Sequence, residues 1–157
     1  MLTHRGTWVI EELPEGRKEI GCQWTYDIKY GPKGEVLRHK ARLVAQGFYQ
    51  ILGLDFGDTF SPTVCLKSLK IILHFAASQG WAQAQDDATG AFLQSYLDCK
   101  IYMRQPPGFT DSTKCPVRLV CSLYGLKQAA RLWNKFMAQR LKSIGYSQFH
   151  LDNTVFI

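Results

Sequence analysis

Apolar and polar residues alternate near the start of the chain in the pattern of β-strands. Trp24, Tyr26 and Ile28 occupy every second position, so their side chains lie on one face of an extended segment. Residues 31–35 (GPKGE) form a strong turn signal, and the alternation resumes after them. Two such strands around a tight turn predict a β-hairpin over residues 20–46.

Two later segments show the spacing of amphipathic helices. The first predicts a buried helix over about residues 66–79, capped by Gly80, and the second predicts a helix over residues 126–143, ended by Gly145. The apolar positions of the first are Leu66, Leu69, Ile72, Leu73 and Ala76. Those of the second are Leu126, Ala129, Ala130, Trp133, Phe136, Met137 and Leu141.

Short apolar runs outside these helices predict further strands. They cover residues 7–10, 81–87, 100–105, 117–122 and 154–157. The mixed order of strands and helices indicates an α+β fold in which helices pack against an antiparallel sheet. The run at 81–87 would deliver Asp87 to the C-terminal end of a strand, where α/β proteins often place their chemistry.

Composition narrows the class of protein without defining its function. The chain has 157 residues, of which 46% are hydrophobic and 20% are charged, as in a folded domain rather than a disordered chain. Five cysteines without CxxC spacing and four scattered histidines indicate neither a zinc site nor a disulfide framework. We recognise no signal peptide and no membrane-spanning run, which favours an intracellular location and no membrane partner.

Positive charge is the first indication of a partner. Lys and Arg outnumber Asp and Glu by 19 to 13, which gives a net charge of +6 and favours a polyanion such as nucleic acid. Arg38, Lys40 and Arg42 share one face of the second hairpin strand, where each side chain could reach a different phosphate oxygen. A solvated basic surface explains the same pattern, and by periodicity alone it is the better explanation.

Asp86 and Asp87 are the strongest candidates for carboxylate chemistry. Because side chains alternate along a strand, only one of the two can face a site. The alternative is that an Asp-Asp pair before Ala-Thr-Gly forms a turn or caps a helix. What favours a functional interpretation is a set of five motifs in fixed order: HKARLVAQGF (39–48), DTFSPTV (58–64), GAFLQ (90–94), IYMRQPPGF (101–109) and SLYGLKQAARLW (122–133).

These motifs together resemble the reverse transcriptase of copia-type LTR retrotransposons, and the resemblance covers nearly the whole chain. It implies an α+β fold that is an incomplete fingers and palm. Residues 1–79 would belong to the fingers, and 96–127 would be the return strands of the fingers. Residues 80–95 would be the palm strand and turn that carry the first catalytic aspartate, and 128–157 the palm helix and a truncated strand.

The resemblance also implies roles for individual residues. Asp87 would be the first catalytic aspartate and a ligand of both Mg²⁺ ions in a two-metal nucleotidyl transfer. Phe92 would close the sugar pocket against a ribose 2′-hydroxyl, and Ala88 would be a nucleotide-binding residue beside Asp87. Lys40 or Arg42 would contact the triphosphate of the incoming nucleotide.

The SLYGLKQ motif would frame the nascent base pair and the template strand through Gly125, Leu126, Lys127 and Gln128. Structural alternatives exist for such residues when each is taken singly. Phe92 could be a core aromatic, Gly125 a glycine at the start of a helix, and Lys127 a surface charge.

The chain departs from the family at several positions. Asp86 stands where the family usually has an apolar residue, Gly90 where it has a hydroxyl or amide residue, Ala130 where it has a proline, and Gln23 where it has a basic residue. A buried, unpaired Asp86 would cost on the order of several kcal/mol or stay neutral. The family's Tyr-Val-Asp-Asp hairpin, which supplies the remaining carboxylates, would follow residue 157, so we expect the isolated chain to be inactive.

Two interpretations of the function stay open. The first is a part of an RNA-directed DNA polymerase within a retroelement polyprotein, acting on an RNA or DNA template-primer and deoxynucleotides, in a cytoplasmic particle or the nucleus. The second is a relic that binds nucleic acid without catalysis, or a remnant that does not fold stably by itself.

Overall fold

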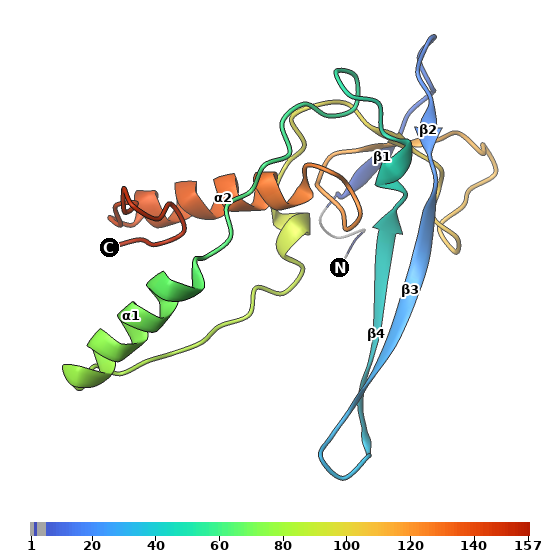
Figure 1. Ribbon diagram of the computed structural model, residues 1–157. Coiled ribbons are helices and arrows are strands. Elements are labelled where there is room, and N and C mark those ends of the chain that lie inside the picture. Colours follow the sequence, from blue (N-terminus) through green and yellow to red (C-terminus); the bar gives the residue numbers. More distant parts are fainter. Residues whose placement is uncertain (1, 3–5) are drawn as a thin grey trace.

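The computed structural model describes residues 2 and 6–157, which form two α-helices and two β-sheets (Figure 1). In chain order the elements are β1 (Trp8–Ile10), β2 (Glu19–Ile20), β3 (Cys22–Tyr30), β4 (Val36–Ala45), the 3₁₀ helix η2 (Gly47–Tyr49), α1 (Leu66–Ser78), the 3₁₀ helix η3 (Ala91–Gln94), β5 (Tyr102–Met103), β6 (Val117–Leu119) and α2 (Ala129–Ser143). The mixed class expected from the sequence is confirmed.

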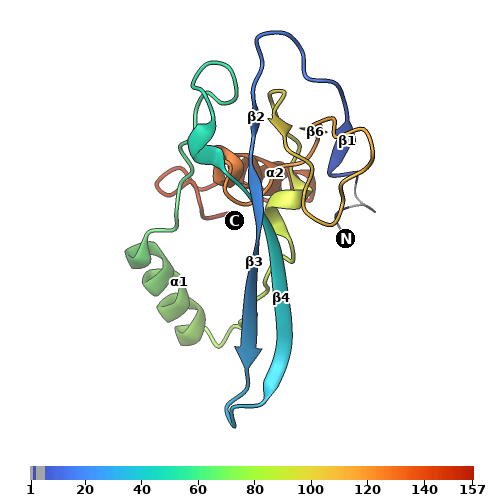
Figure 2. The same ribbon diagram turned by 90° about the vertical axis from the view of Figure 1, so that its right-hand side faces the viewer.

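Strands β3 and β4 form a long antiparallel hairpin that projects from the rest of the molecule (Figures 1 and 2). Their register places Asp27 opposite Lys40. The amide of Gly31 donates to the carbonyl of Glu35 at 2.8 Å, so the GPKGE sequence closes the turn between the strands. The hairpin predicted over residues 20–46 is confirmed.

The second sheet has the strand order β1-β6-β5-β2 and lies where the hairpin begins (Figure 1). β6 pairs antiparallel with both β1 and β5, whereas β2 pairs parallel with β5. The antiparallel sheet expected from the sequence is confirmed for the β1–β6 and β5–β6 pairs, and the β2–β5 pair is parallel. A parallel pair needs a long crossover connection, and residues 21–101 provide it.

The hydrophobic core lies between this sheet, the hairpin base and the start of α2. Its buried members are Ile20, Leu43, Ala45, Leu93, Ile101, Met103, Val117, Leu119, Leu123, Leu126 and Ala129. These residues come from segments far apart in the sequence. The core therefore joins the base of β4 to the segment that precedes α2.

Helix α2 begins at Ala129, three positions later than the apolar stripe predicted. The delay arises because Gly125 adopts a positive φ of 87°, which makes residues 123–128 a turn. Ala129 and Leu132 are buried, whereas Ala130, expected on the apolar stripe, is exposed. The expected end at residue 143 is confirmed.

Helix α1 has the bounds that its sequence predicts, but it is not buried. Among its apolar residues, Leu66 is 62% and Ile71 68% exposed, and only Ala76 is buried. Both views show the helix apart from the sheets, connected by two extended segments (Figures 1 and 2). The expected buried face is wrong because no other described segment covers it. No helix in the described part of the chain is long and apolar enough to cross a membrane.

The two other predicted strands are absent or much reduced in the described part of the chain. Residues 81–88 have no regular structure, since no second segment pairs with their backbone. Residues 154–157 contribute one antiparallel bridge, between Phe156 and Gln148. The prediction of a strand that ends at Asp87 is therefore wrong, although the turn that follows it is present.

Candidate nucleotide-binding cleft

A cleft of about 490 Å³ lies between the hairpin and the segments around residues 87–90 and 123–124. Strand β4 contributes Lys40 and Arg42, and the 87–90 turn contributes Asp87 and Ala88. With Arg38, which also lines this cavity, at least five of the residues singled out by the sequence come together here from two segments far apart in the chain.

The basic side of the cleft carries charge that no acidic residue compensates. Lys40 and Arg42 are half-buried and Arg38 is exposed. None of the three forms an ion pair with a carboxylate in residues 2 and 6–157. Asp27, which lies opposite Lys40, has its nearest cation in Lys29, at 3.8 Å.

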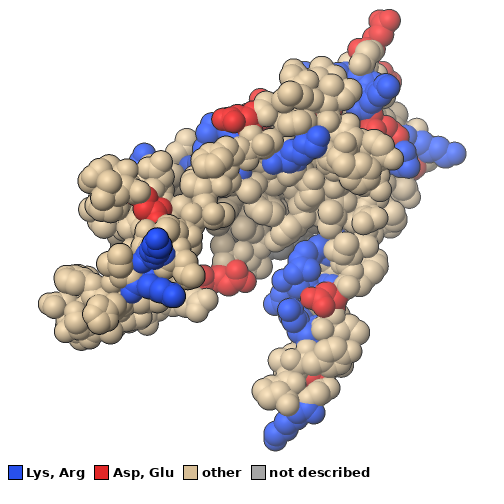
Figure 3. Space-filling model, in the orientation of Figure 1, with Lys and Arg blue, Asp and Glu red and all other residues tan. Residues whose placement is uncertain are grey.

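Figure 3 shows Lys and Arg side chains gathered on the half of the hairpin nearest the body of the molecule, with acidic atoms among them. Uncompensated cations at the edge of a cleft attract phosphates, because neither charge must first be separated from a partner. The basic row is thus suited to hold a phosphate chain.

Asp87 is exposed on the opposite side of the cleft, and its carboxylate contacts no cation of the described residues. Asp86 is also exposed, so it does not carry the cost of a buried charge that an apolar environment would impose. The cleft lining includes Asp87 but not Asp86. One of the two carboxylates therefore lines the cavity, but not because they alternate along a strand, since residues 81–88 form none.

One carboxylate does not form a two-metal centre. No group of three or more His, Cys, Asp or Glu side chains that could hold a metal ion occurs in the described part of the chain. Two-metal nucleotidyl transfer requires several carboxylate oxygens around two ions. The described residues therefore do not by themselves fit a pair of Mg²⁺ ions.

The turn after Asp87 positions an aromatic side chain at the edge of the cleft. Gly90 has a left-handed φ of 62°, which allows the chain to reverse into η3. In η3, Leu93 is buried and Phe92 is half-buried. The ring of Phe92 makes an edge contact with Tyr124, at 4.9 Å between centroids, and Tyr124 itself lines the cleft. Phe92 thus contacts the lining residue Tyr124 but does not itself line the cleft.

Gly125 lies where the segment 122–128 contacts the hairpin most closely. A Cβ atom there would collide with the carbonyl oxygen of Ala45, and one at Gly47 would collide with the carbonyl oxygen of Gly125. The amide of Ala45 donates to the carbonyl of Tyr124 at 2.8 Å. Two glycines therefore permit the backbone contact that fixes this wall of the cleft.

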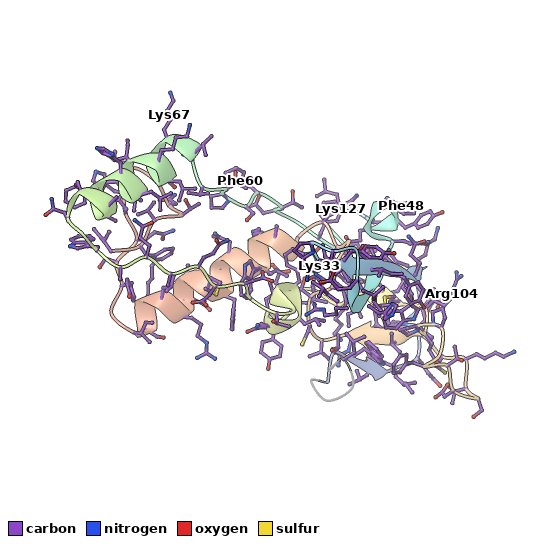
Figure 4. The ribbon with its side chains drawn as sticks, turned by 90° about the horizontal axis from the view of Figure 1, so that it is seen from below. Lys33, Phe48, Phe60, Lys67, Arg104 and Lys127 are labelled. Atoms are coloured by element: carbon purple, nitrogen blue, oxygen red, sulfur yellow. The ribbon has the colours of Figure 1, made fainter. Side chains whose placement is uncertain are left out.

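Lys127 and Gln128 lie outside the cleft lining. The ammonium of Lys127 stands 4.4 Å from the centre of the Phe56 ring and donates to the carbonyl of Gln50 at 3.3 Å (Figure 4). Gln128 is 1% exposed, and its amide nitrogen donates to the carbonyl of Asp55 at 2.9 Å. The structure does not bring these two residues together with Asp87.

Three aromatic residues that were not predicted as site residues line the cleft: Trp24, Phe109 and Tyr124. Trp24 and Phe109 both line it, with ring centroids 6.2 Å apart. The indole nitrogen of Trp24 donates to the carbonyl of Pro107 at 2.9 Å, which joins the hairpin to the 104–116 loop. Their signal in the sequence was an aromatic residue in each of two segments that also carry basic residues, a pattern common in nucleic-acid-binding surfaces.

The carboxylate of Asp152 lies outside the cleft and has a structural role. Hydrogen bonds from the Thr154 hydroxyl, at 2.6 Å, and from Ser68 lower the pKa of Asp152 to about 2. The Cys65 amide at the start of α1 also donates to this carboxylate, at 3.4 Å. Asp152 therefore links the C-terminal hairpin to α1.

A basic strand, an acidic turn and aromatic side chains around one cleft are typical of proteins that bind nucleotides or nucleic acids. The model of the family "Reverse transcriptase (RNA-dependent DNA polymerase)" matches residues 5–157. The chain belongs to this reverse transcriptase family. The resemblance to the copia-type enzymes that the motifs indicated is confirmed.

Curated relatives agree with the family match. The chain is 40% identical over 156 residues to the Retrovirus-related Pol polyprotein from transposon RE1 of Arabidopsis thaliana, with 96% of this chain and 10% of the relative covered. It is 40% identical over 159 residues to the corresponding polyprotein from transposon TNT 1-94 of Nicotiana tabacum, with 99% and 12% covered. The chain thus spans about a tenth of the length of these relatives. No solved structure matches it.

Proposed function

We propose that the chain contributes the fingers and the front part of the palm to an RNA-directed DNA polymerase, and that its cleft binds phosphates both of an incoming deoxynucleotide and of the template-primer beside it. The observation that carries this proposal is the presence of Asp87, Lys40 and Arg42 in the lining of one cleft. In the proposed division, residues 1–79 and 96–127 belong to the fingers and 80–95 and 128–157 to the palm.

Each residue has a role that its position supports. The Lys40 and Arg42 side chains neutralise phosphate oxygens, since neither is engaged by a carboxylate of the described residues. Ala88 and the backbone of the 87–90 turn form the opposite wall. Phe92 bounds the cleft through Tyr124, which is consistent with an aromatic stop beside the sugar.

Asp87 is proposed to contribute one carboxylate to a Mg²⁺ site whose other ligands come from outside the described residues. A bound Mg²⁺ pair would activate the primer hydroxyl and stabilise the leaving phosphate. Because one carboxylate is insufficient, we expect the purified chain not to extend a primed RNA template. Extension that Asp87→Asn abolishes would contradict this expectation.

Binding of a labelled RNA–DNA primer-template to the purified chain, measured over a range of salt concentrations, tests the proposal. We expect weak, sequence-independent binding that falls steeply with salt, because phosphate contacts release counterions. Replacing both Lys40 and Arg42 by Ala should lower the slope of log K against log salt by about 1.8, or about 0.9 for each lost contact.

Lys33, at the exposed tip of the hairpin, provides the matched control (Figure 4). Compared with Lys40→Ala alone, Lys33→Ala removes the same single charge outside the cleft and should change the slope much less. Binding that is absent, insensitive to salt or equally affected by both changes would contradict the proposal.

A second candidate function is nucleic-acid binding without catalysis. The single carboxylate in the cleft favours it, whereas the cationic row serves both candidates equally. The two differ in whether deoxynucleotide binding responds to Mg²⁺. If Mg²⁺ strengthens binding in the wild type but not in Asp87→Asn, the polymerase role is supported, and an identical response in both proteins supports the binding role.

A further inference from the structure

The side chain of Gln50 lies at the centre of a buried polar network beneath the cleft. Its amide nitrogen donates to the side-chain oxygen of Gln128 at 3.0 Å, and its side-chain oxygen accepts from the backbone amide of Lys127 at 2.9 Å. Gln50 is 5% exposed. Both ends of its carboxamide are therefore bound to the segment that leads into α2.

Gln128 is satisfied in the same way. Its amide nitrogen donates to the carbonyl of Asp55 at 2.9 Å and approaches the sulfur of Cys99 at 3.4 Å, while its oxygen accepts from Gln50. A carboxamide offers two donors and one acceptor group, and all are engaged here. Gln128 has no polar group left for a nucleotide or a template base.

Asp55 anchors the network to the rest of the molecule. Its carboxylate accepts from the Arg17 guanidinium at 3.0 Å and from the amide of Ile51 at 3.0 Å. Its carbonyl also accepts from the Cys99 thiol at 2.8 Å, and burial raises the pKa of that thiol, which favours its protonated, donating form. The loop that carries Gln50 is thus held at several points.

The network sets the position of one wall of the cleft. Leu123 and Tyr124 line the cleft and directly precede the residues that Gln50 holds. On their other side, the Tyr124 carbonyl accepts from the amide of Ala45 in β4, the strand that carries Lys40 and Arg42. The distance between the Leu123–Tyr124 wall and β4 therefore depends on two contacts: Gln50 holds Lys127 and Gln128, and Ala45 holds Tyr124.

We propose that Gln50 and Gln128 form a clamp that positions the Leu123–Tyr124 wall against the basic strand, and that Gln128 acts through Gln50 rather than on the nucleic acid. The inference rests on the proposed function for its effect on binding. It assigns Gln50, which the sequence motifs did not single out, as a positioning residue. It also replaces the direct nucleotide contact expected of Gln128.

Amide exchange tests the clamp without any ligand. The Lys127 amide donates to Gln50, so Gln50→Met, which preserves length and volume, should make that amide exchange at least about tenfold faster. Gln139→Met is the matched control, since Gln139 is an exposed residue of α2. Unchanged protection of Lys127 in Gln50→Met would overturn the inference.

A double-mutant cycle on primer-template affinity tests the positioning role. Gln50→Met and Gln128→Met should each weaken primer-template binding by roughly fivefold. Either substitution alone already breaks the clamp, so the double variant should bind at most about twofold more weakly than either single variant. Additive effects would mean that Gln128 acts independently of Gln50, which overturns the inference. A wild-type chain that does not bind would overturn the proposed function, whatever the exchange measurement gives.

The variant Gln50→Glu distinguishes a loss of the Gln50–Gln128 hydrogen bond from a general loss of protein stability. A carboxylate cannot donate to the oxygen of Gln128, but a protonated carboxyl group can. Burial raises the pKa of a carboxyl group, so the new side chain should become protonated as the pH falls from about 7 to about 5. The primer-template affinity of this variant, compared with that of the wild type at the same pH, should therefore recover over this range. A deficit that does not vary with pH would contradict the clamp.

Discussion

The base of the β3–β4 hairpin and helix α1 are held in different ways. At the hairpin base, Leu43 and Ala45 are buried, and the Ala45 amide donates to the carbonyl of Tyr124 at 2.8 Å. In α1, by contrast, Leu66 and Ile71 are mostly exposed. A helix pairs most of its backbone groups within itself, whereas a cleft exists only where two segments meet. The cleft is therefore as well defined as the hairpin base, and independent of α1.

Truncating one apolar side chain in each region gives the largest expected contrast. Leu119→Ala, at a core position that is 1% exposed, should lower the free energy of unfolding by about 2–5 kcal/mol. Ile71→Ala, at a position that is 68% exposed, should lower it by less than about 0.5 kcal/mol. Urea unfolding followed by circular dichroism measures both, and equal losses would show that α1 is packed.

Glycine substitutions test the close contact at the hairpin base. At Gly125 the backbone has a positive φ of 87°, and a Cβ atom would collide with the carbonyl oxygen of Ala45. Gly125→Ala should therefore lower the free energy of unfolding by about 3 kcal/mol. Gly145→Ala has a positive φ of 102° but open space around it, so it should cost only about 1 kcal/mol. Thermal unfolding of the two variants measures the difference. Equal destabilisation would mean that segment 122–128 does not press against β4.

The link between Asp152 and α1 gives a smaller, pH-dependent effect. The pKa of Asp152 is depressed to about 2, so its stabilising contribution is present above the ordinary pKa near 3.8 and is lost as the pH falls through about 2. Asp152→Asn should therefore lower the melting temperature at pH 5 and approach the wild type near pH 2. Asp27→Asn, on the hairpin, is the control. A deficit that stays constant with pH would contradict the link.

The segment that carries Asp87 should show no protection at all. Residues 82–88 make no backbone hydrogen bond within the described part of the chain, so their amides should exchange almost as fast as in an unstructured peptide. The amides of β4 that pair with β3 should be protected. Hydrogen exchange measured by mass spectrometry compares the two, and protection of residues 82–88 would indicate a strand partner.

Local patterns predicted the elements whose partners lie close in the sequence. The GPKGE turn makes β3 and β4 neighbours, so the hairpin follows from the alternation of side chains. The two helices and their glycine ends follow from spacing alone. The parallel β2–β5 pair was missed because its strands are two residues each and far apart in the chain.

The cleft was only partly predictable. The motif resemblance singled out Lys40, Arg42 and Asp87, and the structure adds that they line one cavity. The burial of Gln128 was not foreseeable, because its partner Gln50 lies outside the motifs and neither residue has an apolar spacing that signals burial. Polar networks of this kind depend on tertiary contacts that periodicity does not encode.

The central claim is that the hairpin strand and the acidic turn bind one ligand together. Titration of the isotope-labelled chain with a deoxynucleoside triphosphate, followed by NMR, tests it most directly. If the proposed function is right, the amide signals of Lys40, Arg42, Asp87 and Ala88 shift together with a single dissociation constant. The amide signals of α1 do not move. Shifts confined to the hairpin, with residues 87 and 88 unchanged at saturation, would contradict it.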